Sequence, residues 1–321
     1  MNDGLKPKKI YARALDPIHI GAGGYRLGRV DNTIVRDPAT DIPKIPGTSI
    51  AGVVRAFAEI VKEDDKKKED SNKKLKNIDT EEVFGTESKK GILRFYDGQI
   101  ILFPVSSIQG TVWITTKELI EYWCERIKDE KGEKIEIPDE IGDDAYAIKG
   151  IDTDRKLNHR EKNTDEYLNL GWLLLDIKKP ENGQELVLPS GMDKWVKRIV
   201  VVSEKLFSHI VNDNLEVRTS VRIDPHTGAA AEGALFTYEA IPRGTVFGFE
   251  IGIDYALAKQ KERDIRNIND IRNINDVLNK ITEAVSPYLK NLGIGGMGTR
   301  GFGRLEINLG NNDGGKTNAQ P

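Results

Sequence analysis

The sequence predicts an α+β fold: an antiparallel sheet with helices packed on one side, elaborated by insertions. Three observations support it. Apolar residues recur at helical spacing in 50–61 and 276–289. Two strand-like runs, 217–223 and 233–238, flank a turn whose Pro225 and Gly228 favour chain reversal, which predicts a hairpin. Strands and helices also lack the regular alternation of a doubly wound parallel sheet.

Composition limits the class of protein. The 321 residues are 38% hydrophobic and 31% charged, which indicates a soluble and rather polar chain with enough residues for a substantial core. No apolar run reaches the roughly 18 residues of a membrane span, the N-terminus lacks a signal-peptide pattern, and the single cysteine, Cys124, excludes an intrachain disulfide framework. We therefore expect a cytoplasmic protein without a membrane partner. The net charge of −3 argues against non-specific coating of DNA but not against a locally basic RNA groove.

The most informative stretch runs from His19 to Glu59. A strand at 9–15 leads into a glycine-rich loop, a short apolar run at 30–35, and a helix at 50–61 that Thr48 or Ser49 is placed to cap. Cationic side chains crowd this block. Exposed backbone N–H groups at a helix N-terminus beside cations suit a phosphate backbone. The alternative is a glycine-rich turn followed by an ordinary core helix.

The middle of the chain carries several expectations. Residues 63–90 begin with a charge run and predict a mobile loop, 117–127 predict a helix, and 128–170 read as a polar insertion. Short strands are expected at 173–177, 185–188, 200–204 and 245–253, with a short helix through Ile210. The six-residue duplication at 264–275 fits no solenoid period and reads as a local expansion. The polar tail, 310–321, should be disordered.

A second glycine-rich loop, 293–303, lies between the last predicted helix and a last predicted strand at 304–309. Its spacing matches the dinucleotide-binding fingerprint, but that motif must follow a strand and open a helix, so we reject this interpretation. With Arg300 and Arg304, the loop still offers phosphates a close backbone approach. The alternative is a tight crossover loop that packs on the helix at 48–61.

Asp31 is the sharpest candidate for chemistry. It is a carboxylate inside a short apolar run, flanked by Arg29 and Arg36, and such a position requires a reason. The alternative is a loop aspartate that caps a turn. The four histidines show no metal-ligand spacing, which makes zinc an unfavoured cofactor.

Four ordered blocks carry a family resemblance. IHIGAGG, VDNTIVRDP and IPKIPGTSIAGVVR in the opening block, ILFPVSSIQG, LEVRTSVRIDPHTG and GIGGMGTRGFGR resemble the RAMP (repeat-associated mysterious protein) superfamily. More narrowly, they look like the repeated backbone subunit of type III CRISPR effector complexes, the Cmr and Csm kind. The matches span most of the chain.

The resemblance implies a single RAMP domain over 1–309 with a modified ferredoxin-like (RRM-like) core and a protruding hairpin, the thumb, at 217–238. It implies that the chain binds guide (CRISPR) RNA, assembles with copies of itself and other RAMP-type subunits, and cleaves complementary single-stranded target RNA. Asp31 would be the catalytic residue, positioning a divalent metal, expected to be Mg²⁺, or managing the proton as a ribose 2′-OH attacks the adjacent phosphate.

The expected RNA contacts come from both glycine-rich blocks, which must fold together into one phosphate-binding surface. They are His19, Gly21, Arg29, Arg36, Lys44, Gly47, Ser49, Arg55, Gly295, Gly296, Arg300, Gly301 and Arg304. Ala51 departs from the family pattern, which has a lysine there, and the loss of this cation is expected to weaken the contact with guide phosphates unless Lys44 or Arg55 compensates. Two other functions stay open: an architectural RNA-binding subunit without chemistry, and a stand-alone RNA-processing endonuclease, for which no histidine or tyrosine constellation is evident.

Overall fold

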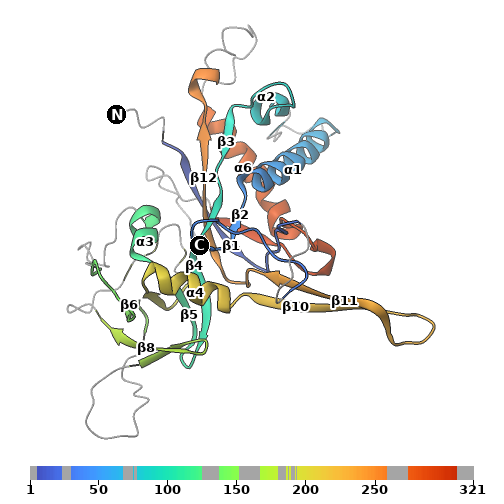
Figure 1. Cartoon of the computed structure of the whole chain (residues 1–321). Helices are drawn as coiled ribbons and strands as arrows, with labels where there is room; N and C mark the ends of the chain where they lie inside the picture. The colour runs from blue at the N-terminus through green and yellow to red at the C-terminus, as the bar shows by residue number, and fades with distance from the viewer. Residues whose placement is uncertain are drawn as a thin grey trace, which may run out of the picture.

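The computed structural model of the chain (Figure 1) describes most, but not all, of its residues. The described ranges are 6–23, 30–67, 75, 78–124, 137–151, 167–179, 186, 188, 192, 194–258 and 274–308. Arg29, most of the duplication at 264–275 and the tail at 310–321 lie outside these ranges, so the expectations for them stay predictions.

Eleven strands in the described residues form one large sheet, ordered β13-β1-β12-β4-β5-β9-β6-β8-β7, with β2 added to β4 and β3 to β12. Most neighbours are antiparallel, as predicted, but β5–β9 and β6–β8 are parallel, so the sheet is mixed. Parallel neighbours need long crossover connections, which the central insertions supply. The strands are β1 Lys8–Ala14, β2 Lys44–Ile45, β3 Leu93–Phe95, β4 Gly98–Ser107, β5 Gly110–Thr115, β6 Ala145–Lys149, β7 Tyr167–Leu170, β8 Leu173–Lys178, β9 Ile199–Val201, β12 Val246–Ile253 and β13 Leu305–Asn308.

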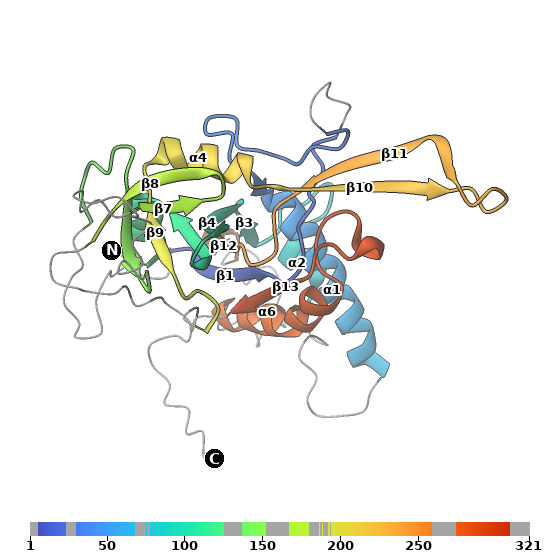
Figure 2. The ribbon, with the colours of Figure 1, turned by 90° about the horizontal axis from the view of Figure 1, so that it is seen from below.

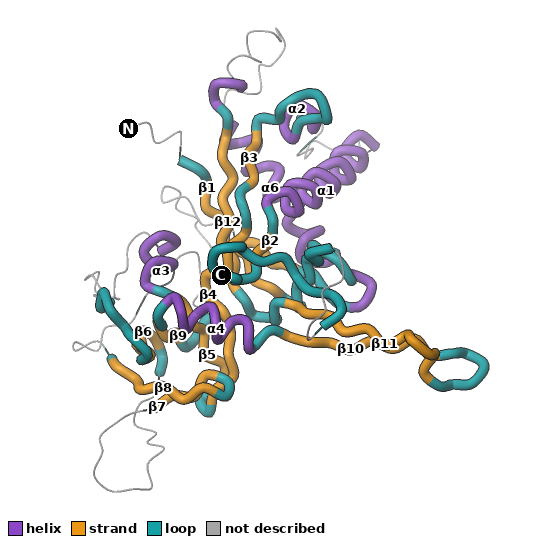
Figure 3. Tube along the Cα trace, viewed as in Figure 1, coloured by secondary structure: helices purple, strands orange, loops and turns teal. Residues whose placement is uncertain are grey.

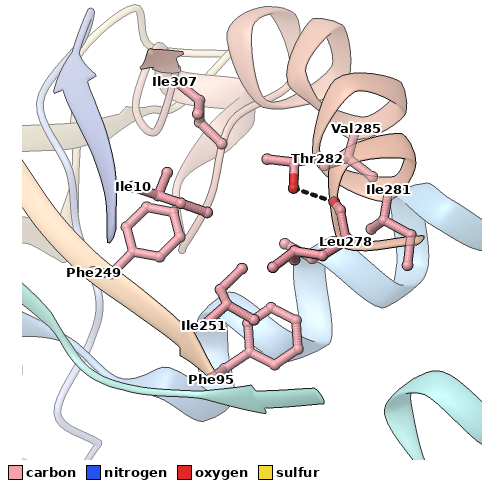
Figure 4. A pocket seen from close by; sticks show the side chains of 10 residues that line it. Ile10, Phe95, Phe249, Ile251, Leu278, Ile281, Thr282, Val285 and Ile307 are labelled. Carbon is pink, nitrogen blue, oxygen red and sulfur yellow. Dashed lines mark hydrogen bonds between the residues drawn. The ribbon is translucent and has the colours of Figure 1, made fainter. Parts of the chain in front are cut away.

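The two helices expected from apolar spacing are present and pack together on one face of the sheet. They are α1, Gly47–Lys67, and α6, Ile274–Asn291. Between them and the sheet lies a void of about 10 Å³ lined by apolar side chains, with Thr282 donating its hydroxyl hydrogen to a helix carbonyl (Figure 4). A void of this size with almost no polar lining is a packing gap and not a ligand site.

The opposite face of the sheet is covered too, which corrects the expectation of helices on one side alone. Successive residues of a strand point to opposite faces: Ile10 of β1 faces α6, whereas Tyr11 faces α3, Lys117–Cys124. The Tyr11 hydroxyl donates to the Trp123 carbonyl, and the Trp123 ring lies so close to Gly248 that an added Cβ would sit 2.7 Å from it. A second apolar core forms around these aromatic residues.

The predicted thumb hairpin is present as β10, Glu216–Ile223, and β11, Ala230–Ala240. The two strands pair in antiparallel register from Glu216–Ala240 outward, with an irregularity between Val221 and Ile223. Figures 1 and 2 both show the hairpin projecting away from the sheet and helices. The chain enters it from α4, Glu204–Asp213, the short helix expected through Ile210.

Three sequence predictions are wrong at their boundaries. The first helix continues to Lys67, into the predicted loop 63–90, because Lys66 pairs with Glu63 and lysines in the last turn favour the helix dipole. The same region also holds α2, Thr80–Phe84. The predicted insertion 128–170 contains β6, whose first four residues are buried between β8 and β9 in the sheet.

One predicted strand is not found in the described residues. Leu186 and Leu188, the described residues of the run at 185–188, are buried and lie outside any strand. Apolar residues close together matched the strand pattern, but their burial alone explains them. The short apolar run at 30–35 makes isolated bridges. No helix in the described part of the chain is long and apolar enough to cross a membrane.

Candidate nucleic-acid interface at the base of the thumb

The segment that carries Asp31 lies along β11 where the thumb leaves the body. Asn32 donates its N–H to the Thr237 carbonyl at 3.1 Å and accepts the Glu239 N–H at 3.0 Å, forming a parallel bridge. In Figure 3 this loop, drawn in teal, passes over the root of β10 and β11. Residues more than 200 positions apart therefore share one local structure.

Thr237 holds the Asp31 carboxylate. Its backbone N–H and its hydroxyl both donate to Asp31 Oδ2 at 2.8 Å, and the hydroxyl oxygen accepts the Asp31 N–H at 2.9 Å. The Thr237 N–H, followed by its hydroxyl, holds the pKa of Asp31 below its usual range. Asp31 is thus an ionised carboxylate at neutral pH, and its Oδ1 makes no hydrogen bond to the described residues.

Arg36 is paired inside the protein. Its guanidinium makes a two-point ion pair with Glu239, with Nη1–Oε2 and Nη2–Oε1 distances of 2.8 and 2.7 Å, and Nε donates to Asn212. The Glu239 carboxylate raises the pKa of Arg36 further. The residue expected to contact RNA therefore fixes the 31–36 segment to β11, and an RNA contact by Arg36 would require this pair to open.

The glycine-rich segments from the two ends of the chain meet, as the sequence predicted. The Gly296 N–H donates to the His19 carbonyl, and the Gly303 N–H to that of Pro17, both at 2.9 Å. Gly295 has a φ of +89°, and a Cβ there would lie 2.6 Å from the His19 carbonyl oxygen. Only glycine permits this approach, and the loop leaves Gly295, Gly296 and Gly301 exposed.

His19 is buried at this junction, and Gly21 is exposed beside it. His19 is 4% exposed, and its Nδ1 lies 2.7 Å from the Glu239 carbonyl oxygen. Gly21 leaves room for the ring, since a Cβ there would sit 3.3 Å from His19 Nε2. This placement fits a buried structural histidine.

Arg300 differs from the other described candidate cations. It is exposed, donates to the Tyr238 hydroxyl and lies over the Tyr238 ring, 5.4 Å from its centroid. Both interactions are with a neutral group. By contrast, Arg304 pairs with Asp16, Arg55 with Glu59, and Arg36 with Glu239. Within the described residues, Arg300 keeps its positive charge without a carboxylate partner.

The N-terminus of α1 is already filled. Asp97 accepts the Gly47 N–H at 2.8 Å and pairs with Lys44 Nζ at 2.8 Å, and Lys44 also approaches Asp37 at 3.6 Å. Asp97 satisfies the helix start in place of Thr48 or Ser49, which lie within the first turn, so the predicted cap is wrong. Gly47 is required because a Cβ would lie 2.4 Å from the Phe95 carbonyl oxygen.

Arg55 and Cys124 are structural in this arrangement. Arg55 donates to the Gly85 carbonyl at 2.9 Å and ties α1 to the end of α2. Burial raises the pKa of the Cys124 thiol to about 12, so it is an inert thiol at neutral pH. In the part of the chain that the structure describes, no three histidine, cysteine or acidic side chains gather as a metal-binding group.

Sequence reasoning missed three consecutive residues of β11. Thr237 holds Asp31, Tyr238 holds Arg300, and Glu239 holds Arg36. The strand alternation placed Thr237 and Glu239 on one side and Tyr238 on the other, but nothing in the local pattern identified the partners. The one sequence feature that could have pointed to these residues is the pair Thr237 and Glu239, two polar side chains on the same face of a strand that enters the core.

Comparison with known proteins agrees with this architecture. A family model described as the RAMP superfamily matches residues 11–306. The CRISPR system Cmr endoribonuclease Cmr4 of Pyrococcus furiosus is 30% identical over 312 residues, which cover 92% of either protein. The chain therefore belongs to the RAMP superfamily, and within it is a homologue of Cmr4.

Solved structures show the same fold. A type III-B Cmr-beta complex bound to cognate target RNA contains a chain that is 14% identical, with a TM-score of 0.61 over 94% of this chain and 96% of that one. Oligomeric Cmr4 from Pyrococcus furiosus is 20% identical, with a TM-score of 0.55 over 94% and 98%. The predicted family and α+β RAMP fold are confirmed.

Proposed function

We propose that the chain is a repeated backbone subunit of a type III CRISPR effector complex, which binds guide RNA in the cytoplasm and cleaves the complementary target RNA. Support comes from its relatives: Cmr4 is named an endoribonuclease, one Cmr4 structure is oligomeric, and one Cmr-beta complex holds target RNA. Copies of the chain and other RAMP-type subunits are then its protein partners.

One observation carries the cleavage part of the proposal. An ionised carboxylate with an unused oxygen, Asp31, and a cation without a carboxylate partner, Arg300, are both held at the root of β11, by Thr237 on one side of the strand and by Tyr238 on the other. Phosphate contacts position a nucleic acid, and a carboxylate placed next to a held phosphodiester can assist its cleavage. The exposed glycine-rich loop beside Arg300 adds backbone N–H groups for the same strand.

The thumb face that bears Thr237 continues outward as an apolar surface. Directly opposite residues of antiparallel strands share a face, and Val221 pairs with Leu235 two positions further along each strand. Their side chains are exposed. Apolar side chains of this kind insert between bases and unstack them, so the thumb would distort the guide–target duplex near Asp31.

A divalent metal, expected to be Mg²⁺, fits this site only if substrate phosphates and water supply most of its ligands. No group of three or more acidic, histidine or cysteine side chains surrounds Asp31 in the described residues, and Mg²⁺ is commonly held through one or two carboxylates together with substrate phosphates and water. A bound ion would offset negative charge on the phosphate. The lowered pKa of Asp31 favours a charge-positioning role over proton transfer, because a weak base removes a proton poorly.

In the proposed reaction, the ribose 2′-oxygen attacks the adjacent phosphorus, and the bond from phosphorus to the 5′-oxygen breaks. The 2′-OH proton is lost to solvent, and the leaving 5′-oxygen gains one. The products are a 2′,3′-cyclic phosphate and a 5′-hydroxyl. Asp31 orients the scissile phosphate for in-line attack, Arg300 anchors the RNA backbone at the thumb root, and this positioning accounts for the rate gain.

The test is cleavage of a complementary target by the purified chain loaded with guide RNA and magnesium. Asp31→Ala and the isosteric Asp31→Asn should abolish cleavage, a loss of at least about 100-fold, while leaving guide affinity unchanged, because Asn retains the shape but not the charge. Addition of a chelator should also stop the reaction. Unchanged cleavage by both variants would remove Asp31 from the mechanism.

The second candidate function is an architectural RNA-binding subunit. The observation that favours it is that no group of three or more acidic, histidine or cysteine side chains gathers at Asp31 within the described residues. In that case guide and target bind normally, and no cleavage occurs with any divalent metal until another subunit is added.

A further inference from the structure

The Thr237 hydroxyl does two things at once at the thumb base. It donates to Asp31 Oδ2 and accepts the Asp31 backbone N–H, at 2.8 and 2.9 Å. With the Thr237 N–H as a second donor, Oδ2 has two hydrogen bonds at 2.8 Å. A carboxylate with one oxygen held this way has little freedom to rotate, so its other oxygen keeps a fixed direction.

We propose that Thr237 is a positioning residue for Asp31: it sets the orientation in which the carboxylate meets the target RNA. The inference rests on the cleavage function proposed above and extends it to a residue on the thumb. Thr237 reaches no reacting atom itself and acts through Asp31.

The hydrogen bonds around Thr237 also link the direction of the Asp31 carboxylate to the position of the thumb. The Asn32 N–H and carbonyl are hydrogen-bonded to the backbone of Thr237 and Glu239, and the Arg36–Glu239 ion pair holds the far end of the segment. Asp31 therefore moves with β11. A displacement of the thumb root changes where the carboxylate points, whereas a displacement of its tip does not.

The chain offers a matched control. Thr219 lies directly opposite Thr237 in the hairpin register and on the same face. It makes no hydrogen bond to Asp31 in the described structure. Thr219→Val and Thr237→Val make the same chemical change on two adjacent strands, with equal strand propensity.

The experiment measures kcat and KM for target cleavage by the guide-loaded chain, with guide affinity and thermal unfolding measured in parallel. Thr237→Val should lower kcat about tenfold, the size of effect seen for residues that orient a functional group, with KM and guide affinity unchanged. Thr237→Ser, which keeps the hydroxyl, should restore kcat. Thr219→Val should leave both constants as they are.

The outcomes separate this inference from the function on which it depends. Loss of cleavage in Asp31→Ala together with full activity in Thr237→Val would refute the positioning role and leave the proposed function standing. Equal losses in Thr237→Val and Thr237→Ser, or a rise in KM alone, would also refute it. Full activity in Asp31→Ala would refute the proposed function first.

Discussion

The thumb base and the N-terminus of α1 were both predicted to contact RNA, and they differ in what their charged groups already hold. At the α1 N-terminus, Asp97 takes the Gly47 N–H and the Lys44 ammonium, so the anion site is occupied by the protein's own carboxylate. At the thumb base, Arg300 is paired only with neutral groups in the described structure, and Asp31 keeps an unused oxygen.

The comparison shows that a basic residue near a predicted RNA site does not always offer its charge to a ligand, because a carboxylate of the protein can already neutralise it. Lys44 and Arg300 look alike in a glycine-rich block, and an RNA strand would gain more from Arg300, because Lys44 must first give up two carboxylates. Only the unpaired charge contributes fully to phosphate binding and to counterion release.

The largest expected effect concerns the shape of the glycine loop. Gly295→Ala forces a Cβ against the His19 carbonyl at positive φ and should lower the unfolding free energy by about 2 kcal/mol. Gly298→Ala is the control, since a Cβ there meets nothing within 4 Å. Chemical denaturation of both variants measures the effect. Equal stability of the two would mean that the loop does not need its close contact with residue 19.

The next effect separates the two candidate phosphate sites. Arg300→Ala should reduce the salt dependence of guide binding, with the slope of log K against log salt falling by about 0.7 for a single strand. Arg300→Lys should retain the slope, and Lys44→Ala should leave it unchanged because Lys44 is already neutralised. Titrations at several salt concentrations decide. A reduced slope in Lys44→Ala would show that Asp97 yields to RNA.

The smallest effect tests Asp97 as the cap of α1. Asp97→Ala should lower the unfolding free energy by about 1 kcal/mol, as for the loss of other helix caps. Asp97→Asn, which retains an acceptor for the Gly47 N–H, should lose less. Guide affinity should not change in either variant. A gain of affinity in Asp97→Ala would contradict the view that this site is purely structural and would make it a masked phosphate site.

Much of the fold was readable from local patterns. The helices that became α1 and α6, the hairpin at 217–238 and the strands at both ends of the chain are periodic segments bounded by turn residues. The errors fall where the pattern was weak. β6, for example, is five residues long and lies between polar stretches, so it was hidden within the predicted insertion at 128–170.

The sequence by itself determined the family, the α+β class and the hairpin, and it singled out Asp31 and the two glycine-rich loops as candidates, because these depend on residue type and on spacing along the chain. The tertiary structure alone decided which charged side chains are paired within the protein and which are left for a ligand. Thr237, Tyr238 and Glu239 meet Asp31, Arg300 and Arg36 across 62 to 206 positions of sequence. No local pattern encodes such contacts, because packing of the sheet and thumb brings them together.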